Sequence, residues 1–199
     1  VVHNGSSTRY LCVFIAKPNN VSGGNYLFTK YRQGNFGFGG ANDSGAVWGF
    51  LNNKLYLGSV DFGDTDKCRV ESVSLVDNNA FNIYGVIFDT NLGSSPNFSD
   101  RCRIFINKQE VAKTVIDSND GENNGNTAPV IIGGLGGDNI NIYYSGFCAT
   151  LYLAPITSSD GVARLGEIID FLADRYGLFS DTIPSNTIPS SYSLLFSGS

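Results

Sequence analysis

Short runs in which apolar and polar positions alternate recur along most of the chain. In residues 101–107, for example, Cys102, Ile104 and Ile106 share one face. The other face holds Arg101, Arg103, Phe105 and Asn107. A period of two residues is typical of a β-strand with one buried face. Clusters of Gly, Asn, Asp and Ser, which favour turns, separate the runs. The predicted strands cover residues 9–17, 25–31, 35–38, 47–50, 54–60, 68–76, 81–90, 101–107, 110–116, 130–133 and 144–153.

The apolar period changes from two residues to 3.6 near the end of the chain, in residues 158–176. The apolar positions that form one helical stripe there are Val162, Leu165, Ile168, Ile169, Leu172 and Tyr176. Ser158 or Ser159 can cap the start of a helix, and Gly177 stands where a glycine commonly follows one. We therefore expect an amphipathic helix that covers an edge or one face of a sheet.

These elements together predict an all-β fold: a two-sheet antiparallel jelly-roll sandwich with one C-terminal amphipathic helix. A length of 199 residues is compatible with one domain, which we place at residues 1–178. Residues 179–199 repeat the motif Thr-Ile-Pro-Ser and are rich in serine, which predicts an extended tail or linker.

Composition excludes several classes of function. The net charge is −5 and the chain has no Lys/Arg cluster. Because nucleic-acid binding needs a basic surface, we do not expect the protein to bind nucleic acid. No apolar run is long enough to insert into a membrane. The only histidine is His3, near a chain end that we expect to be frayed, so we expect no Ser-His-Asp, Cys-His or multi-histidine metal site. The chain begins with Val and has no Met, as expected of a processed protein or a piece of a larger one.

Three segments near the end of the chain carry a resemblance to a known family. They are the Ile132-Gly133-Gly134 triplet, the run Ser145-Gly146-Phe147 with the strand that follows it, and the closing segment at residues 171–178. The sequence here resembles the concanavalin A-like, laminin-G-like jelly-roll superfamily. Thr150 stands where many members carry a Glu, so any role tied to that Glu does not transfer.

The resemblance implies two kinds of protein. Some members are non-catalytic modules of secreted carbohydrate-active proteins, adhesins, and phage or viral appendages; others are glycoside hydrolases and polysaccharide lyases. A retaining glucanase of this fold carries paired carboxylates as Glu-x-Asp-x-x-Glu on one strand. Glu71, Glu110, Glu122 and Glu167 have no such setting. We therefore expect a protein that is not an enzyme, with a hydrolase or lyase as the less favoured alternative.

Aromatic and polar side chains in or beside Gly/Asn-rich loops are candidates for ligand binding. Ring faces stack on sugars, and amide and carboxylate groups hydrogen-bond their hydroxyls. The alternative is that the rings belong to the core. The predicted ligand-binding residues are Trp48, Tyr31, Asn42, Asp43, Tyr143 and Tyr144.

One acidic loop is a candidate metal site. Asp61, Asp64 and Asp66 cluster the oxygen ligands that calcium prefers. The alternative is an ordinary acidic turn, and we expect no other cofactor.

The four cysteines contain no Cys-x-x-Cys pair. The resemblance places the first and last strands side by side, so Cys12 and Cys148 are expected to be neighbours and are the candidate disulfide. Two free thiols are the alternative at this pair. Cys68 and Cys102 are expected to be free buried thiols, which pack well in protein cores.

The resulting hypothesis is a non-catalytic recognition module of a larger extracellular or virion-associated assembly. Its partners would be a glycan or cell-surface receptor, bound weakly and in several copies, and other protein subunits or further copies of itself. The alternative is a structural fibre, tail or capsid-decoration domain whose partner is a protein.

Overall fold

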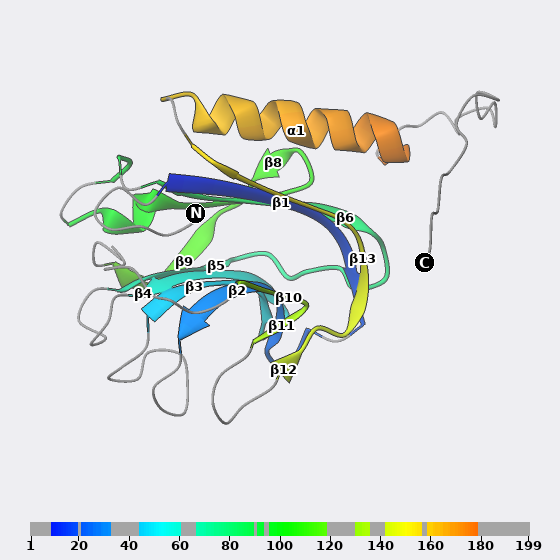
Figure 1. Cartoon of the computed structure of the whole chain (residues 1–199), viewed down its shortest axis with the longest axis horizontal. Coiled ribbons are helices and arrows are strands. Elements are labelled where there is room, and N and C mark those ends of the chain that lie inside the picture. The colour runs from blue at the N-terminus through cyan, green and yellow to red at the C-terminus, as the bar shows by residue number, and fades with distance from the viewer. Residues whose placement is uncertain are drawn as a thin grey trace, which may run out of the picture.

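Two antiparallel sheets stack face to face, and one helix lies across the outer face of the first sheet (Figure 1). This computed structural model describes residues 9–19, 21–32, 44–60, 67–89, 91–93, 96–118, 130–135, 142–156 and 159–178. The predicted fold class, a jelly-roll sandwich with a C-terminal helix, is confirmed. The predicted strand at residues 35–38 and the predicted tail at residues 179–199 lie outside the described residues.

The first sheet has the strand order β13-β1-β6-β7-β8. Its strands are β1 (Arg9–Pro18), β6 (Asn82–Asp89), β7 (Cys102–Ile106), β8 (Gln109–Glu110) and β13 (Gly146–Pro155). The first and last strands of the chain pair antiparallel along their whole length, from Tyr10 opposite Pro155 to Pro18 opposite Gly146. The predicted pairing of these two strands is confirmed.

The second sheet has the order β10-β2-β3-β4-β5-β9. Its strands are β2 (Asn25–Arg32), β3 (Ser44–Leu51), β4 (Lys54–Val60), β5 (Lys67–Ser72), β9 (Lys113–Ser118) and β10 (Val130–Ile132). Asn52 and Asn53 join β3 to β4 with φ of 53° and 63°, as a two-residue hairpin loop requires. A short 3-10 helix, η1 (Phe98–Arg101), precedes β7, and β11 (Gly134–Leu135) pairs with β12 (Ile142–Tyr143) as a separate ribbon.

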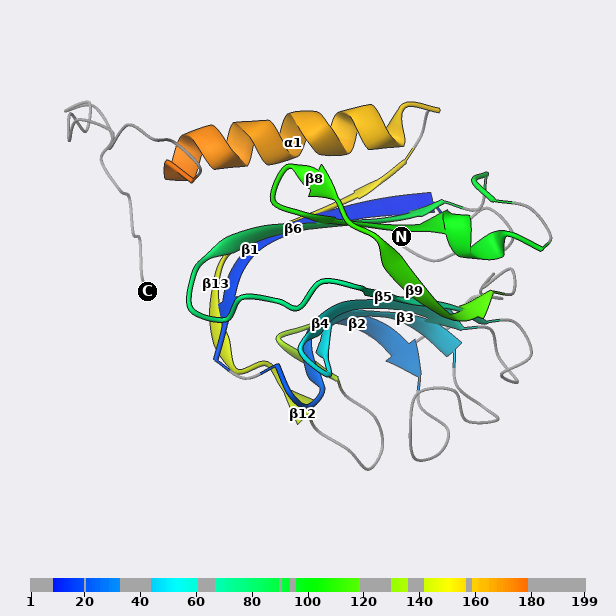
Figure 2. The ribbon, with the colours of Figure 1, turned by 180° about the vertical axis from the view of Figure 1, so that it is seen from behind.

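The space between the sheets is filled by aromatic rings. Trp48 stacks on Phe28 with ring centroids 4.2 Å apart and planes 15° apart, and the Tyr10 ring lies 4.7 Å from that of Trp48. Phe14 and Tyr84 extend the stack, with their centroids 5.2 Å apart. Such ring pairs add to the stability that area burial already provides. On the side of the sandwich seen in Figure 2, the segment between β5 and β6 runs between the sheets, where Val76 is buried.

A second apolar layer lies between the first sheet and the helix α1 (Gly161–Tyr176). Leu165, Ile169 and Leu172 from the helix pack on the outer faces of β1 and β6. Gly85 in β6 allows this close approach, because a Cβ there would meet the tips of Leu165 and Ile169 at 3.2 Å. Since β1 and β6 are buried on both faces, their sequences are nearly continuous apolar runs.

The helix ends as predicted but begins later. Gly177 has a φ of 62°, and its N–H donates to the carbonyls of Ala173 and Asp174. The helix starts at Gly161 with Asp160 as its N-cap residue, so the predicted caps Ser158 and Ser159 are wrong. Tyr176 was predicted on the buried stripe but is exposed, because it belongs to the last turn.

Two predicted strands differ in extent. The run at residues 68–76 leaves the sheet after Ser72, whose hydroxyl accepts the Leu55 N–H at 3.0 Å and donates to the Ser74 carbonyl at 2.7 Å. The run at residues 110–116 is divided, because Glu110 pairs with β7 in the first sheet and β9 begins at Lys113 in the second. The two-residue strands β11 and β12 were not predicted, since so short a run shows no alternation.

Candidate ligand-binding site

Three connecting segments leave the second sheet at the same end. Strands β2, β4 and β9 finish there and strands β3, β5 and β10 begin there, because neighbouring strands run antiparallel. The connections are residues 33–43, 61–66 and 119–129, which lie outside the described residues. We call this end the loop end of the second sheet. The segments attached at this end hold several of the predicted site residues.

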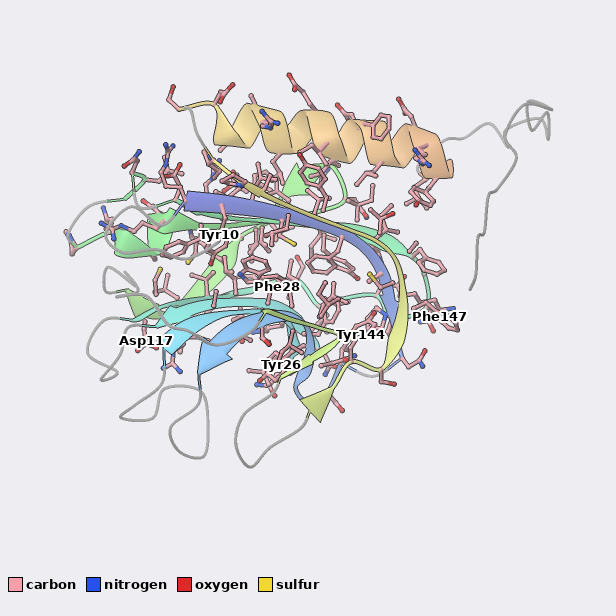
Figure 3. The ribbon with its side chains drawn as sticks, in the orientation of Figure 1. Tyr10, Tyr26, Phe28, Asp117, Tyr144 and Phe147 are labelled. Atoms are coloured by element: carbon pink, nitrogen blue, oxygen red, sulfur yellow. The ribbon has the colours of Figure 1, made fainter. Side chains whose placement is uncertain are left out.

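A polar cluster lies on the outer face of the second sheet near the loop end. Arg69 in β5 is directly opposite Asp117 in β9, and its Nε donates to Asp117 Oδ2. The Tyr56 side chain from β4 also hydrogen-bonds Arg69. We call Tyr56, Arg69 and Asp117 the Arg69 cluster. Figure 3 shows Asp117 on the outer side of the second sheet, whereas Tyr10 and Phe28 lie between the sheets.

The electrostatics of the cluster follow from partial burial. Burial raises the pKa of Tyr56 far above its usual range, although the charge of Arg69 acts in the opposite direction, so Tyr56 keeps its hydroxyl proton. Burial acts to lower the pKa of Arg69, but its hydrogen bonds with Asp117 and Tyr56 raise it above its usual value. The side chains of Arg69 and Asp117 remain 18% and 28% exposed, so a ligand can reach both.

A second ion pair continues the polar surface away from the loop end. Lys54 Nζ lies 2.5 Å from Glu71 Oε1, and Glu71 is opposite Tyr56 in the register of β4 and β5. The face therefore presents positive and negative groups side by side. Such a surface offers N–H donors and carboxylate acceptors to a polyhydroxylated ligand. The Tyr56 ring itself is buried, so it stacks on no ligand in this structure.

The other half of this face is covered by protein. Thr29 Oγ1 in β2 donates to the Gly134 carbonyl of β11 at 3.0 Å. Asn25 Nδ2 donates to the Ser145 carbonyl at 2.9 Å, and the Ser145 N–H donates back to Asn25 Oδ1 at 2.8 Å. These bonds hold β11 and the start of β13 against β2. Among the described side chains, those of β4, β5 and β9 supply the polar groups of this face that a ligand can reach.

The prediction that Trp48 is an exposed ligand-binding residue is wrong. Trp48 is fully buried in the middle of β3, between Phe28 and Tyr10. The Gly/Asn-rich run before it suggested a rim loop, but β3 begins at Ser44 and turns the Trp48 side chain inward. Trp48 is removed from solvent because the two sheets pack face to face.

Of the other predicted ligand-binding residues, only Tyr144 has a side chain within the described structure. Tyr144 is half-buried against the core, and its hydroxyl donates to the Phe147 carbonyl at 3.1 Å. Burial raises the pKa of Tyr144. Tyr31 and Tyr143 lie in β2 and β12, and their side chains are outside the described residues, as are Asn42 and Asp43. A binding role for these five residues stays a prediction.

The predicted calcium loop, with Asp61, Asp64 and Asp66, also lies outside the described residues. Within the described ranges, no three His, Cys, Asp or Glu side chains gather closely enough to hold a metal ion. No helix in that part of the chain is both long enough and apolar enough to cross a membrane.

The predicted disulfide between Cys12 and Cys148 is contradicted by strand register. Cys12 lies opposite Leu153, whereas Cys148 lies opposite Ala16, four residues further along β1. At roughly 3.3 Å per residue this offset is about 13 Å, and a disulfide needs Cα atoms within about 7 Å. Cys12 is buried and Cys148 is exposed, and both are free thiols. The strands are neighbours as predicted, but the two thiols do not meet.

The Arg69 cluster was not among the predicted site residues, although the pattern held a clue to it. In residues 68–72, Cys68 and Val70 alternate with Arg69 and Glu71, which assigns the two charged residues to one face. Nothing in the sequence pairs Arg69 with Asp117, which is 48 residues away and is opposite it only through sheet register.

The fold defines a class: a jelly-roll sandwich with a helix on one sheet and an open polar area on the other. No family model matches the chain, and no curated protein matches it. Among solved structures, the CBM40 of the Ruminococcus gnavus IT-sialidase bound to α2,3-sialyllactose is similar, with a TM-score of 0.56 and 15% identity over 81% of this chain and 82% of that one. The same CBM40 bound to α2,6-sialyllactose has a TM-score of 0.54 and 14% identity over 79% and 82%. At this identity the likeness shows the fold.

Proposed function

We propose that the protein is a non-catalytic glycan-binding module of the concanavalin A-like superfamily, and that the Arg69 cluster forms part of its binding site. The observation that carries the proposal is the pairing of Arg69 with Asp117, both partly exposed, at the loop end of a jelly-roll sheet. Support comes from the R. gnavus CBM40, which has the same architecture and was solved with sialyllactose bound.

The chemistry of the cluster suits a sugar. The guanidinium of Arg69 carries several N–H donors in a fixed plane, which can bind two neighbouring sugar oxygens or one carboxylate. Asp117 accepts hydrogen bonds from hydroxyl groups. Hydrogen bonds to charged groups contribute more than neutral ones, but desolvation and ordering offset much of the gain. One copy should therefore bind with a Kd on the order of 0.1–1 mM.

Weak single sites become useful when several copies act together, because a tethered second site binds at high effective concentration. We infer that the module works as one part of a larger extracellular assembly, on a virion or a secreted protein. Calcium in the loop with Asp61, Asp64 and Asp66 belongs to this proposal, since in the chain that loop joins β4, which holds Tyr56, to β5, which holds Arg69.

One observation favours the alternative of a structural domain with a protein partner. Phe81 and Phe147 lie on the first sheet with ring centroids 6.4 Å apart, and they are 40% and 61% exposed. Figure 3 shows Phe147 pointing outward at the bend of β13. Exposed contiguous apolar surface commonly marks a protein contact. A partner that covers these rings would make the domain a subunit of a fibre, tail or capsid.

The test is a glycan array, with sialylated and neutral glycans, probed with a multimeric form of the protein. The strongest glycan is then titrated against wild type, Arg69→Gln and Asp117→Asn. We expect each variant to weaken binding about tenfold or more, since each loses a hydrogen bond to a charged group. Arg103→Gln is the matched control, because Arg103 forms a similar surface pair with Glu110 on the first sheet.

The proposal also predicts that a reducing-sugar assay finds no turnover of any polysaccharide. An array without a specific hit, together with loss of self-association in Phe147→Asp, would favour the structural alternative. A hit whose affinity is unchanged in both cluster variants would place the site elsewhere.

A further inference from the structure

Two cysteines from different sheets face each other in the core. Cys68 lies in β5 of the second sheet and Cys102 at the start of β7 in the first. Their Sγ atoms are 3.1 Å apart, and both side chains are fully buried. Both are free buried thiols in this structure, as was expected, but nothing in the sequence placed them together.

The backbone on each side of this contact is fixed by neighbouring strands. Cys68 is paired with Ser59 in β4 and with Ser118 in β9, so β5 is held on both sides. Cys102 is paired with Phe88 in β6, and Lys113 Nζ donates to its carbonyl at 2.8 Å. A disulfide requires the sulfur atoms to approach by only about a further 1 Å, which rotation of the two side chains can supply.

We propose that Cys68 and Cys102 form a disulfide that joins the two sheets. The reaction is an exchange with an external disulfide such as oxidised glutathione. The thiolate of one cysteine attacks that disulfide, a mixed disulfide forms, and the thiolate of the other cysteine displaces the remaining thiol. The two cysteines lose two protons and two electrons, and the external disulfide becomes two thiols.

Burial determines when the bond forms. The folded pair is out of reach of an oxidant, and burial raises the pKa of the Cys102 thiol well above its usual value, so little thiolate is present. The exchange therefore takes place during folding, before the sheets close. The finished bond is then shielded from reductants. Disulfides persist in oxidising compartments, so this inference agrees with an extracellular setting but does not depend on glycan binding.

The experiment starts from the reduced, unfolded chain, which is refolded in a mixture of oxidised and reduced glutathione and then alkylated in guanidinium. We expect two alkylated cysteines, Cys12 and Cys148, and four after reduction. Digestion at lysine releases residues 68–108 as one peptide that holds both core cysteines. The mass of that peptide should be two hydrogens lower than that of the reduced peptide, and the peptide should carry no alkyl group. Four alkylated cysteines in chains that have regained the native fold would overturn the proposal, as would a peptide that pairs Cys68 or Cys102 with Cys12 or Cys148.

Thermal unfolding supplies an independent test. Chains that are reduced in guanidinium and refolded without an oxidant, or that carry the double substitution Cys68→Ala with Cys102→Ala, should have a Tm lower by roughly 10 °C, from the usual gain for a loop of this length. Cys12→Ala is the control, because it also truncates a buried cysteine but leaves the Cys68–Cys102 bond and its resistance to alkylation intact. Equal Tm values for the oxidised and reduced proteins would contradict the proposed link between the sheets.

Discussion

Truncation of Trp48 measures directly whether this ring belongs to the core or to a binding surface. In the structure the ring is fully buried, stacked on Phe28 and in contact with Tyr10. Trp48→Ala would therefore remove a large side chain from a closely packed interior and leave a cavity that the rigid strands cannot close. We expect a strongly destabilised protein.

The expected loss can be estimated from two contributions. Truncation of a buried aromatic side chain to alanine costs about 3–5 kcal/mol, which includes the cavity. Each lost ring pair, one with Phe28 and one with Tyr10, is worth about 0.5–1.5 kcal/mol beyond area burial, and part of this is already counted in the first figure. We therefore expect a loss of about 4–5 kcal/mol in the free energy of unfolding. For a domain of this size that corresponds to a fall in Tm of roughly 8–20 °C.

The assay is guanidinium unfolding followed by far-UV circular dichroism, because the substitution removes the only tryptophan. Phe147→Ala is the matched control, since its ring is 61% exposed and its loss should change stability by less than about 0.5 kcal/mol. A Trp48→Ala protein as stable as wild type would refute the packing described here and restore Trp48 as a surface residue.

Three further predictions concern the helix and a surface ion pair. Gly85→Val should lower the free energy of unfolding by about 1–3 kcal/mol, because the added side chain meets the helix residues above it; unchanged stability would mean that the helix does not dock there. Gly166→Ala should raise stability by up to about 1 kcal/mol, since nothing lies near that Cβ and alanine favours the helix; a lower Tm would contradict this. Hydrogen bonding to Arg103 lowers the pKa of Glu110 from its ordinary value of 4.5. The pair therefore stabilises the folded state at pH values above 4.5. This stabilisation is lost as the pH falls through the lower pKa that Glu110 has in the folded protein. Denaturation between about pH 3 and pH 6 should show wild type and Glu110→Gln converging at the acidic end; a constant difference would disprove the linkage.

Much of the fold could be predicted because it depends on local patterns. Alternation located most of the strands, and Gly177 has the left-handed conformation expected after a helix. The errors lie where short-range pattern and sheet pairing conflict. Glu110 and Lys113 are three residues apart, yet they belong to different sheets, and no local period contains that information.

The candidate site was harder to predict because its parts meet only through register. A bulky ring beside a glycine-rich loop is equally compatible with a binding surface and with a core. For Trp48, the packing of the two sheets places the ring in the core. Arg69 and Asp117 face each other because β5 pairs with β9, and Cys12 and Cys148 miss each other because of a four-residue offset. Each outcome depends on contacts between segments that are distant in the sequence.

The most direct test of a glycan site at the Arg69 cluster is a two-dimensional ¹H–¹⁵N NMR titration with the strongest glycan from the array. The account predicts that the Arg69 side-chain Nε–H signal and the amide signals of Tyr56 and Asp117 shift progressively and saturate, while those of Arg103 and Glu110 do not move. Shifts confined to Phe81 and Phe147, or a spectrum unchanged at saturating glycan, would contradict it.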